Sequence, residues 1–347
     1  MIAVSRTKSK GSRLSLTTTE ETFPVSYSTL ACDALLSKVL PKYRLEAVQS
    51  CEFWHRGLSD IYVIETSIRS YILRVSHHHW RSRSETQFEL DLLDFLRKRD
   101  IPVSHPLRTW ENQLLVEINA PEGKRYAALF TYASGQIPLG DLNSSQSRQL
   151  GQTVARLHQV SRHFHTDHYR SPLTLEYLLD RSVEAIAPFL QLRSSDLSDL
   201  HNTAETIRAQ LADFPKNADL WGICWGDPHS GNAHFTNSGE ITLFDFDQCG
   251  YGWRIFDIAK FLQVSLQAGL GRSSRDAFIQ GYQDIYPLTD WEKYTLPAFT
   301  QVAQIWSWAI SLQSAKMYDY SRLNHGYFSR YLQQLKRLES KDWQPGF

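Results

Sequence analysis

Two carboxylates and a carboxamide occur close together between residues 221 and 257. Asp227 and Asn232 lie five positions apart in a polar loop, and Asp245 follows an apolar run that ends at Phe244. Mg²⁺ prefers oxygen ligands of this kind, and in phosphoryl transfer one carboxylate receives the proton of the attacking hydroxyl. A second carboxylate and an amide hold the metal on the phosphates of a nucleotide. The pattern therefore favours magnesium-dependent phosphoryl transfer, with Asp227 facing the hydroxyl and with Asn232 and Asp245 as metal ligands.

The residues beside Asp227 have backbone properties that suit such a loop. Pro228 disfavours helical backbone at the residue before it, so we expect Asp227 on an extended turn. Gly226 and Gly231 flank the loop and allow close approach to phosphates or a positive φ angle. His229 is a further candidate catalytic residue, and we expect it to fix the loop rather than to act as the base.

At these positions the sequence resembles the aminoglycoside phosphotransferase and choline kinase superfamily, the small-molecule relatives of protein kinases. The loop of that family reads H-G-D-x-H-x-G-N and is followed by D-F/I-D. This chain has W-G-D-P-H-S-G-N from Trp225 to Asn232 and D-F-D from Asp245 to Asp247. The resemblance extends over nearly the whole chain from about Phe23, and it is strongest to the branch of homoserine kinase-like enzymes and bacterial stress-response kinase A. Trp225 departs from the pattern, because the family has a usually structural histidine there.

The resemblance implies an α+β, bilobal, protein-kinase-like fold with ATP and Mg²⁺ as cofactors. Residues 23–133 would form a nucleotide-binding lobe, an antiparallel sheet with one long helix. Residues 134–347 would form a mostly helical lobe with the catalytic loop and the acceptor site. Residues 1–22 are expected to be a disordered basic tail, since their first 19 positions hold four basic residues and no acid. The composition of that tail also allows an organelle transit peptide.

Composition limits the functional classes. Basic and acidic residues balance at 37 each, which disfavours a nucleic-acid partner bound through phosphate neutralisation. No apolar run approaches the roughly 18 residues that would cross a membrane. The 4 cysteines show no C-x-x-C spacing, which is typical of reduced packing thiols. We therefore expect a cytoplasmic protein that acts on a small-molecule hydroxyl acceptor.

Apolar segments predict the elements of the first lobe. We expect strands on both sides of a turn within 51–64, further strands at 71–75, 114–118 and 126–132, and helices at 26–40 and 83–99. The turn from Arg56 to Asp60 corresponds to a reduced glycine-rich loop in the family. The resemblance therefore places Gly57, Ser59 and Asp60 over the phosphates, although an ordinary hairpin would have the same pattern.

Arg74 lies at the centre of an apolar strand, where an isolated charge would be costly. The resemblance gives it the role of the kinase lysine, which pairs with phosphates and with a helix glutamate. Arginine keeps the charge and adds bidentate geometry. Glu89 is the expected partner and Glu85 the alternative, while a surface arginine and a solvated glutamate remain the simpler interpretations.

The segment that follows the last strand is a natural hinge between lobes. Phe130 and Tyr132 precede Ser134 and Gly135, and in the superfamily the backbone here binds adenine, although an ordinary linker would look the same. After it, a helix beginning near Leu150 resembles the family's L-G-x-x-L-A-x-L-H element. The small residues Gly151 and Ala155 in that helix permit a close crossing.

Two further acids and two groups of histidines remain. Asp257 opens an apolar helix, where the helix dipole favours an acidic residue. The resemblance implies a second role, in which Asp257 braces the catalytic loop. Asp247 could lean toward metal or substrate, or be structural. The runs at 77–79 and 163–168 hold three histidines each, but we do not expect either to bind metal, because neither has a convincing ligand spacing.

The acceptor is the least determined feature. An amino alcohol of the homoserine or choline type is the expected class, because the 22 acidic and 19 basic residues from Ser134 onward lack the acidic excess that an aminoglycoside site would favour. About a dozen residues separate Asp245 from Asp257, which favours a small acceptor over a protein. A Ser/Thr protein kinase and, because of Trp225, a nucleotide-binding pseudokinase are the alternatives.

Overall fold

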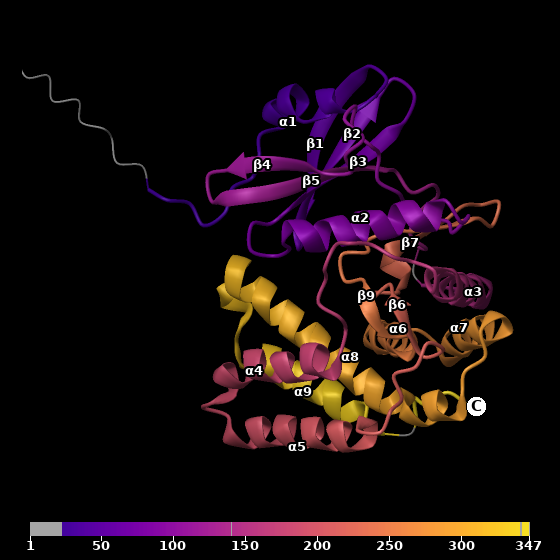
Figure 1. The fold of residues 1–347 in the computed structure, drawn as a ribbon. Helices are drawn as coiled ribbons and strands as arrows, with labels where there is room; N and C mark the ends of the chain where they lie inside the picture. Colours follow the sequence, from indigo (N-terminus) through magenta and orange to yellow (C-terminus); the bar gives the residue numbers. More distant parts are fainter. Residues whose placement is uncertain (1–22, 140, 341, 347) are drawn as a thin grey trace, which may run out of the picture.

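The N-terminal part of the chain is an antiparallel sheet of 5 strands in the order β1-β2-β3-β5-β4. The computed structural model describes residues 23–139, 141–340 and 342–346. The strands are β1 (Val48–Arg56), β2 (Ser59–Thr66), β3 (Ser70–Ser76), β4 (Val116–Ala120) and β5 (Gly123–Thr131). Helix α1 (Cys32–Lys38) covers the outer side of the sheet, and α2 (Arg83–Arg97) lies between the sheet and the helical part of the molecule (Figure 1).

The alternation of side chains along β2 and β3 separates two faces of this sheet. Tyr62, Ile64 and Leu73 are fully buried in an apolar cluster with α1. Ile61 and Arg74, one position away from these residues, face the other way and line a cavity. Because successive strand residues point to opposite faces, one face forms a core and the other is available for a ligand.

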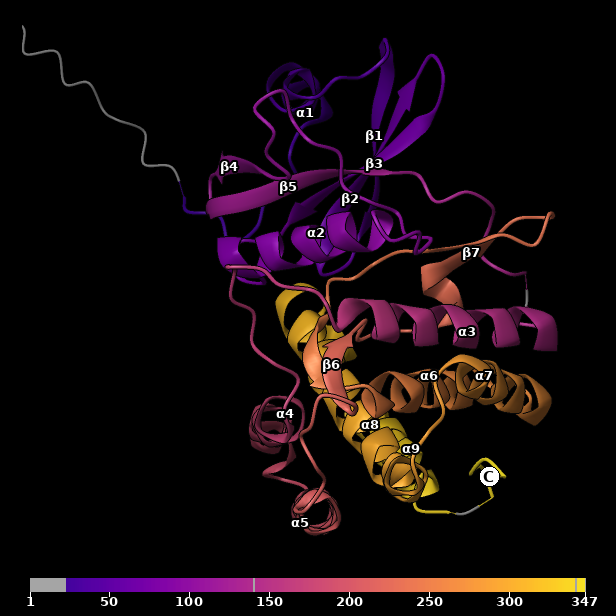
Figure 2. The same cartoon turned by 45° about the vertical axis from the view of Figure 1, so that its right-hand side comes forward.

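The remainder of the chain is mostly helical, as Figures 1 and 2 show. Its helices are α3 (Ser144–Ser161), α4 (Arg181–Ile186), α5 (Ser194–Leu211), α6 (Ile255–Ala268), α7 (Arg272–Ile285), α8 (Asp290–Tyr318) and α9 (His325–Arg337). Two small antiparallel pairs lie among them: β6 (Trp221–Cys224) with β9 (Gly250–Trp253), and β7 (Ala233–Phe235) with β8 (Ile241–Leu243). No helix among the described residues is long and apolar enough to span a membrane.

The α+β, bilobal architecture expected from the sequence is confirmed, with differences in the helices. The predicted helix 26–40 shortens to α1, and Pro41 lies inside a following 3₁₀ turn instead of ending the helix. Residues 176–190 are broken into a π turn, α4 and a 3₁₀ turn. Helix α6 begins at Ile255, so that Asp257 lies in its first turn, and α7 was not predicted.

The β7–β8 pair is held to the first lobe at both ends. Gln136, just after the hinge, exchanges backbone hydrogen bonds with Phe235, and the Ser104 amide donates to the Leu243 carbonyl at 2.8 Å. Gly135 has a φ of 89°, and a Cβ there would lie 2.4 Å from the Phe235 carbonyl oxygen. This close approach requires glycine, and it fixes β7, the partner of the strand β8 that precedes Asp245.

Helices α3 and α7 cross at very short range, side by side in Figure 2. A Cβ at Gly151 would lie 2.0 Å from the Phe278 carbonyl oxygen, and one at Gly281 would lie 2.1 Å from that of Arg148. The close crossing expected at Gly151 is confirmed, and the glycine that faces it across the helices is Gly281, a residue in the helix that was not predicted.

The substitution Gly151→Ala tests this crossing. We expect a loss of about 1–3 kcal/mol in the free energy of unfolding, because the overpacked contact is with backbone that cannot rotate away. That loss would outweigh the gain of about 1 kcal/mol in helix propensity. Gly222→Ala is the control, since nothing lies within 4 Å of a Cβ there. Urea unfolding measures both, and a Gly151→Ala protein as stable as the control would contradict the packing.

Candidate active site

A cavity of about 1030 Å³ lies between the two lobes, and we call it the interlobe cavity. The residues expected from the sequence to bind nucleotide or metal come from six separate segments of the chain. Those that line the interlobe cavity are Gly57, Ser59, Arg74, Glu89, Phe130, Tyr132, Asn232, Asp245 and Asp247. The fold therefore brings together most of the predicted site.

Asp60 is an exception and corrects the expectation that it contacts phosphates. Its side chain is fully buried on the other face of β2, where its carboxylate accepts a hydrogen bond from Arg125 at 2.8 Å and lies beside Tyr27 and His77. Burial alone would raise its pKa, but these partners lower the pKa of Asp60 to about 2. Asp60 thus anchors Arg125 beneath the sheet, while Ser59, its neighbour, faces the interlobe cavity.

Arg74 and Glu89 form the expected ion pair. Two parallel hydrogen bonds join them, Nη1 to Oε1 at 2.8 Å and Nη2 to Oε2 at 2.7 Å. Glu85, the alternative partner, instead forms a capping box with Ser82 at the start of α2. The bidentate pair fixes the plane of the guanidinium, which also lies 4.9 Å from the centre of the Phe130 ring.

Asp257 braces the loop that carries Asp227. Its carboxylate accepts the backbone N–H groups of Trp225 at 2.7 Å and Gly226 at 2.8 Å. His158 lies with Nε2 2.8 Å from the same carboxylate and Nδ1 2.8 Å from the Tyr282 hydroxyl. Because a carboxylate can only accept, the proton of His158 is on Nε2. Asp257 therefore has the bracing role that the family resemblance suggested.

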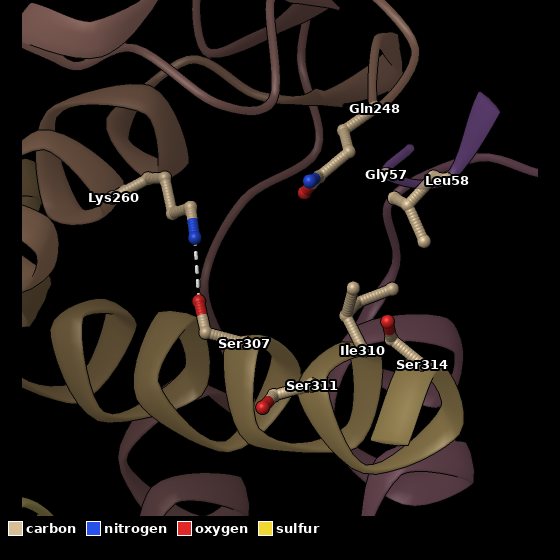
Figure 3. Close-up of a pocket in the computed structure, with 8 residues that line it drawn as sticks. All are labelled: Gly57, Leu58, Gln248, Lys260, Ser307, Ile310, Ser311 and Ser314. Atoms are coloured by element: carbon tan, nitrogen blue, oxygen red, sulfur yellow. Dashed lines mark hydrogen bonds between the residues drawn. The ribbon is translucent and has the colours of Figure 1, made fainter. Parts of the chain in front are cut away.

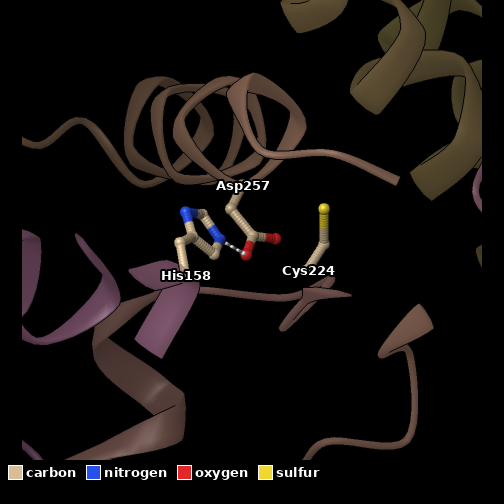
Figure 4. Close-up of side chains that lie close together, drawn as sticks. All are labelled: His158, Cys224 and Asp257. Carbon is tan, nitrogen blue, oxygen red and sulfur yellow. Dashed lines mark hydrogen bonds and ion pairs between the residues drawn. The ribbon is translucent and has the colours of Figure 1, made fainter. Parts of the chain in front are cut away.

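His158, Cys224 and Asp257 offer three potential metal-ligand atoms within 4.8 Å of one another (Figure 4). Each is buried and has a protein partner, since the Cys224 thiol donates to the Trp253 carbonyl at 3.3 Å. Burial raises the pKa of Cys224 well above its usual value, which opposes formation of a thiolate ligand. The arrangement is that of a structural network.

Trp225, the departure from the family pattern, is fully buried in this network. Its indole N–H donates to the Asp245 carbonyl at 3.1 Å, and its ring stacks on Phe246 with centroids 5.3 Å apart. The Trp225 side chain thus joins the loop that carries Asp227 to the segment that carries Asp245.

Asp227 is surrounded by donors and cations. Its carboxylate lies 3.4 Å from Lys260 Nζ, 3.5 Å from His229 Nε2 and 3.3 Å from the Gln248 amide. His229 Nδ1 accepts the Gly231 N–H, so Nε2 carries the proton, in agreement with a loop-fixing role. Burial would raise the pKa of Asp227, but Lys260 and His229 hold it well below its usual range. Asp227 is therefore ionised at neutral pH.

Lys260 and Gln248 were not predicted from the sequence. Lys260 lies on α6 one turn after Asp257 and is only 5% exposed. A lysine within a helix whose neighbours Ala259 and Phe261 are fully buried is the signal that could have identified it. Gln248 follows Asp247 directly, but its direction depends on the turn that leads into β9.

Asp245 has properties that suit a metal ligand. It is exposed to the interlobe cavity, and no hydrogen bond to its carboxylate is present among the described residues. Loss of hydration and the nearby Asp247 raise the pKa of Asp245 to about 6, with Arg74 opposing. The Asn232 amide N–H group donates to Asp227, which leaves its carbonyl oxygen available. One carboxylate and one amide oxygen in a region of excess negative charge fit Mg²⁺.

Asp247, two positions later, is already neutralised by protein groups. Its carboxylate accepts from the Trp80 indole and lies 3.5 Å from Arg81 Nε. Its backbone carbonyl accepts from Arg81 at 2.7 Å and from Arg170. Burial would raise the pKa of Asp247, but Arg81 and Arg170 lower it. These contacts favour the structural interpretation of Asp247, as a tie between the two lobes.

A second, smaller cavity of about 270 Å³ adjoins the interlobe cavity, and we call it the smaller cavity (Figure 3). The two cavities share Gly57, Leu58 and Gln248. The rest of its lining comes from Lys260 and from one face of α8, with Ser307, Ile310, Ser311 and Ser314. Asp227 is not among the described residues that line either cavity, but its carboxylate contacts Gln248, which lines both, and Lys260, which lines the smaller one.

Comparison with known proteins gives results that agree with this geometry. The model of the family described as "Phosphotransferase enzyme family" matches residues 51–296. An uncharacterised protein of Synechocystis sp. is 55% identical over 324 residues, which are 93% of this chain and 90% of the relative.

Two solved kinase structures share the fold. An amicoumacin kinase in complex with AMP-PNP, Ca²⁺ and Ami has a TM-score of 0.72 at 22% identity, covering 91% of this chain and 95% of that one. A microcompartment-associated aminopropanol kinase has a TM-score of 0.71 at 19% identity, covering 88% and 95%. At these identities, the likeness to both structures concerns the fold.

The raised pKa of Asp245 has a consequence for stability. The carboxyl ionises near pH 4 in the unfolded chain but near pH 6 in the fold, so stability falls as pH rises from about 4 to about 6. We expect Asp245→Asn to raise the Tm by about 1–2 °C at pH 7.5 in metal-free buffer and by less at pH 5. Asparagine tolerates the φ of 56° at this position, so no backbone strain is added.

Asp247→Asn is the matched control, with the opposite sign expected. The pKa of Asp247 is lowered by arginines, so its ionised form stabilises the fold and its loss should reduce the Tm at pH 7.5. Differential scanning calorimetry of both variants at the two pH values measures the effect. A Tm difference for Asp245→Asn that is the same at both pH values would contradict it.

Proposed function

This chain belongs to the phosphotransferase enzyme family and is a phosphotransferase with a hydroxyl group as acceptor, and we propose that ATP with Mg²⁺ is its donor and a small molecule its acceptor. The observation that supports the proposal is the contact of Asp227 with Gln248, which lines both cavities, and with Lys260, which lines the smaller cavity. A nucleotide in the first cavity and an acceptor in the second would place their reacting atoms at this carboxylate.

The interlobe cavity supplies groups for each part of ATP. Arg74, held by Glu89, and the loop at Gly57 and Ser59 would bind the phosphates. Phe130 and Tyr132 would border the base at the hinge. The Ala133 carbonyl accepts one hydrogen bond from His234 at 2.8 Å, and the second lone pair of this oxygen remains available to the base.

Bound to Asp245 and Asn232, Mg²⁺ would neutralise charge on the phosphates. Asp227 accepts a hydrogen bond from the acceptor hydroxyl and so directs the hydroxyl oxygen toward the terminal phosphorus. A new P–O bond forms, the bond to the bridging oxygen of ADP breaks, and the hydroxyl proton passes to Asp227. The low pKa makes Asp227 a weak base, so its main effect is orientation, as phosphoryl transfer requires.

The smaller cavity supports a small acceptor over a protein. Helix α8 supplies four of its eight lining residues, so the acceptor side is walled by a packed helix. The amino alcohol expected from the sequence, of the homoserine or choline type, is compatible with this size. The pseudokinase alternative rested on Trp225, whose buried hydrogen bond to Asp245 keeps the loop in place.

Asp227→Ala tests the proposed function. Turnover of Mg-ATP with acceptor should fall about 10²–10⁴-fold, because the hydroxyl loses its orienting group. Affinity for AMP-PNP, measured by titration calorimetry, should remain within a few-fold of wild type, since Asp227 lies outside the phosphate-binding groups. Asp213→Ala, in an exposed loop, is the control. Wild-type turnover by Asp227→Ala would refute the assigned role.

A further inference from the structure

The lining of the smaller cavity indicates the chemical class of the acceptor. We infer that this cavity takes an uncharged, polyhydroxylated molecule, such as a polyol or a single sugar ring, rather than an amine. The inference rests on the proposed function, and it follows from the hydrogen bonds and charges of the eight residues that line the cavity.

Among the described residues that line this cavity, Lys260 is the one that carries a charge, and its ammonium group is held by an ion pair and two hydrogen bonds. It lies 3.4 Å from Asp227 Oδ1 and donates to the Gln263 side chain at 3.3 Å and to the Ser307 hydroxyl. An ammonium has three N–H donors, and two of them are used in the hydrogen bonds to Gln263 and Ser307, so at most one is left beside Asp227. The pair of Lys260 and Asp227 is also neutral overall, so neither charge is free to select a charged acceptor.

The groups that remain available are neutral. Ser311 accepts from the Tyr327 hydroxyl at 3.2 Å, which leaves its own proton to donate. Ser314 has no hydrogen-bond partner among the described residues. Gln248 donates one N–H to Asp227 and accepts from Trp306 at 3.2 Å, so its second N–H is unused. Hydroxyl groups, which both donate and accept, match this set.

A cationic acceptor would lack a counter-charge here. The nearby acids are Asp227, paired with Lys260, Asp247, paired with Arg81, and Asp245, which faces the interlobe cavity. No lining residue of the smaller cavity is acidic. Moving an ammonium from water into this site would sacrifice hydration without an ion pair in return, which is unfavourable.

The volume of the smaller cavity limits the acceptor further. Its 270 Å³ is just below the range of about 300–1,000 Å³ of pockets for drug-sized ligands. A single ring or short chain of hydroxylated carbons can enter, with Ile310 against its carbon skeleton. The absence of an acidic group among the described lining residues disfavours a polycationic aminoglycoside.

Two measurements on the full-length protein test the inference. The first is ³¹P NMR detection of transfer from Mg-ATP to three sets of acceptors: neutral polyols and monosaccharides, amino alcohols including homoserine, choline and aminopropanol, and a mixed protein substrate. The highest kcat/KM should belong to a neutral polyol or sugar. A higher value for an amino alcohol or protein would overturn the inference and leave the proposed kinase activity standing.

The second measurement is calorimetric binding of the same small molecules to the AMP-PNP–Mg²⁺ complex, which needs no turnover. Preferential binding of a neutral polyol or sugar supports the inference even if transfer is not detected. In that case the proposed kinase activity is refuted, and the inference about the class of molecule bound still stands. Binding of amines only, or of none of the panel, overturns the inference.

A pair of variants on α8 assigns the preference to this cavity. Ser314→Asp adds a carboxylate to the lining, and it should weaken polyol binding about threefold to tenfold and strengthen amino alcohol binding by a similar factor. Gln313→Asp adds the same charge on the exposed side of the helix and should leave both unchanged. Equal effects of the two variants would show that the cavity-facing side of α8 does not determine which acceptor binds, and would overturn the inference.

Discussion

The carboxylate of Asp257 is the interaction on which the site depends. It accepts two successive backbone N–H groups, those of Trp225 and Gly226, and so fixes the direction in which the chain enters the loop of Asp227. Backbone groups in this buried place need partners, and one carboxylate supplies both. His158 holds that carboxylate from the opposite helix, and Trp225 extends the same network to the Asp245 carbonyl. The positions of the two acids in the proposed chemistry therefore follow from a third acid outside the cavities.

The partner of each acid determines its role. Asp227 has a lysine and remains ionised with reduced basicity, which suits orientation of a hydroxyl. Asp247 has arginines on its carboxylate and carbonyl, which ties the lobes together. Asp245 has no hydrogen-bond partner for its carboxylate among the described residues, and burial with the nearby Asp247 raises its pKa to about 6. In the proposed function a divalent cation at Asp245 would offset this unfavourable charge, so we expect stability and metal affinity to be linked.

Much of this arrangement could be predicted from the sequence, where local rules apply. The family resemblance implied that Arg74 pairs with a helix glutamate, helical spacing selected Glu89, and the structure confirms the pair. The spacing of Asp227, Asn232 and Asp245 along the chain predicted that these three residues belong to one site. The prediction for Asp60 was wrong because a turn residue was read as a loop ligand, although alternation from Tyr62 places it on the core face of β2. Extending the side-chain alternation of β2 back to Asp60 would have given the correct face.

Other parts could not be predicted because they depend on how distant helices are oriented. The serine face of α8 meets Lys260 of α6 only through tertiary packing, and nothing in either segment indicates which face turns inward. The close crossing of α3 and α7 needs Gly281, which lies 130 positions after Gly151. Trp225 could be noticed as a departure, but its bond to Asp245 depends on the turn that carries that carbonyl.

A crystal structure of the complex with AMP-PNP and Mg²⁺ tests the central claim most directly. The account predicts a magnesium ion with oxygen ligands from Asp245 and Asn232 at about 2.0–2.1 Å, on phosphates that lie beside Arg74. A metal held by Asp247 in place of Asp245, or a nucleotide bound outside the interlobe cavity, would contradict it.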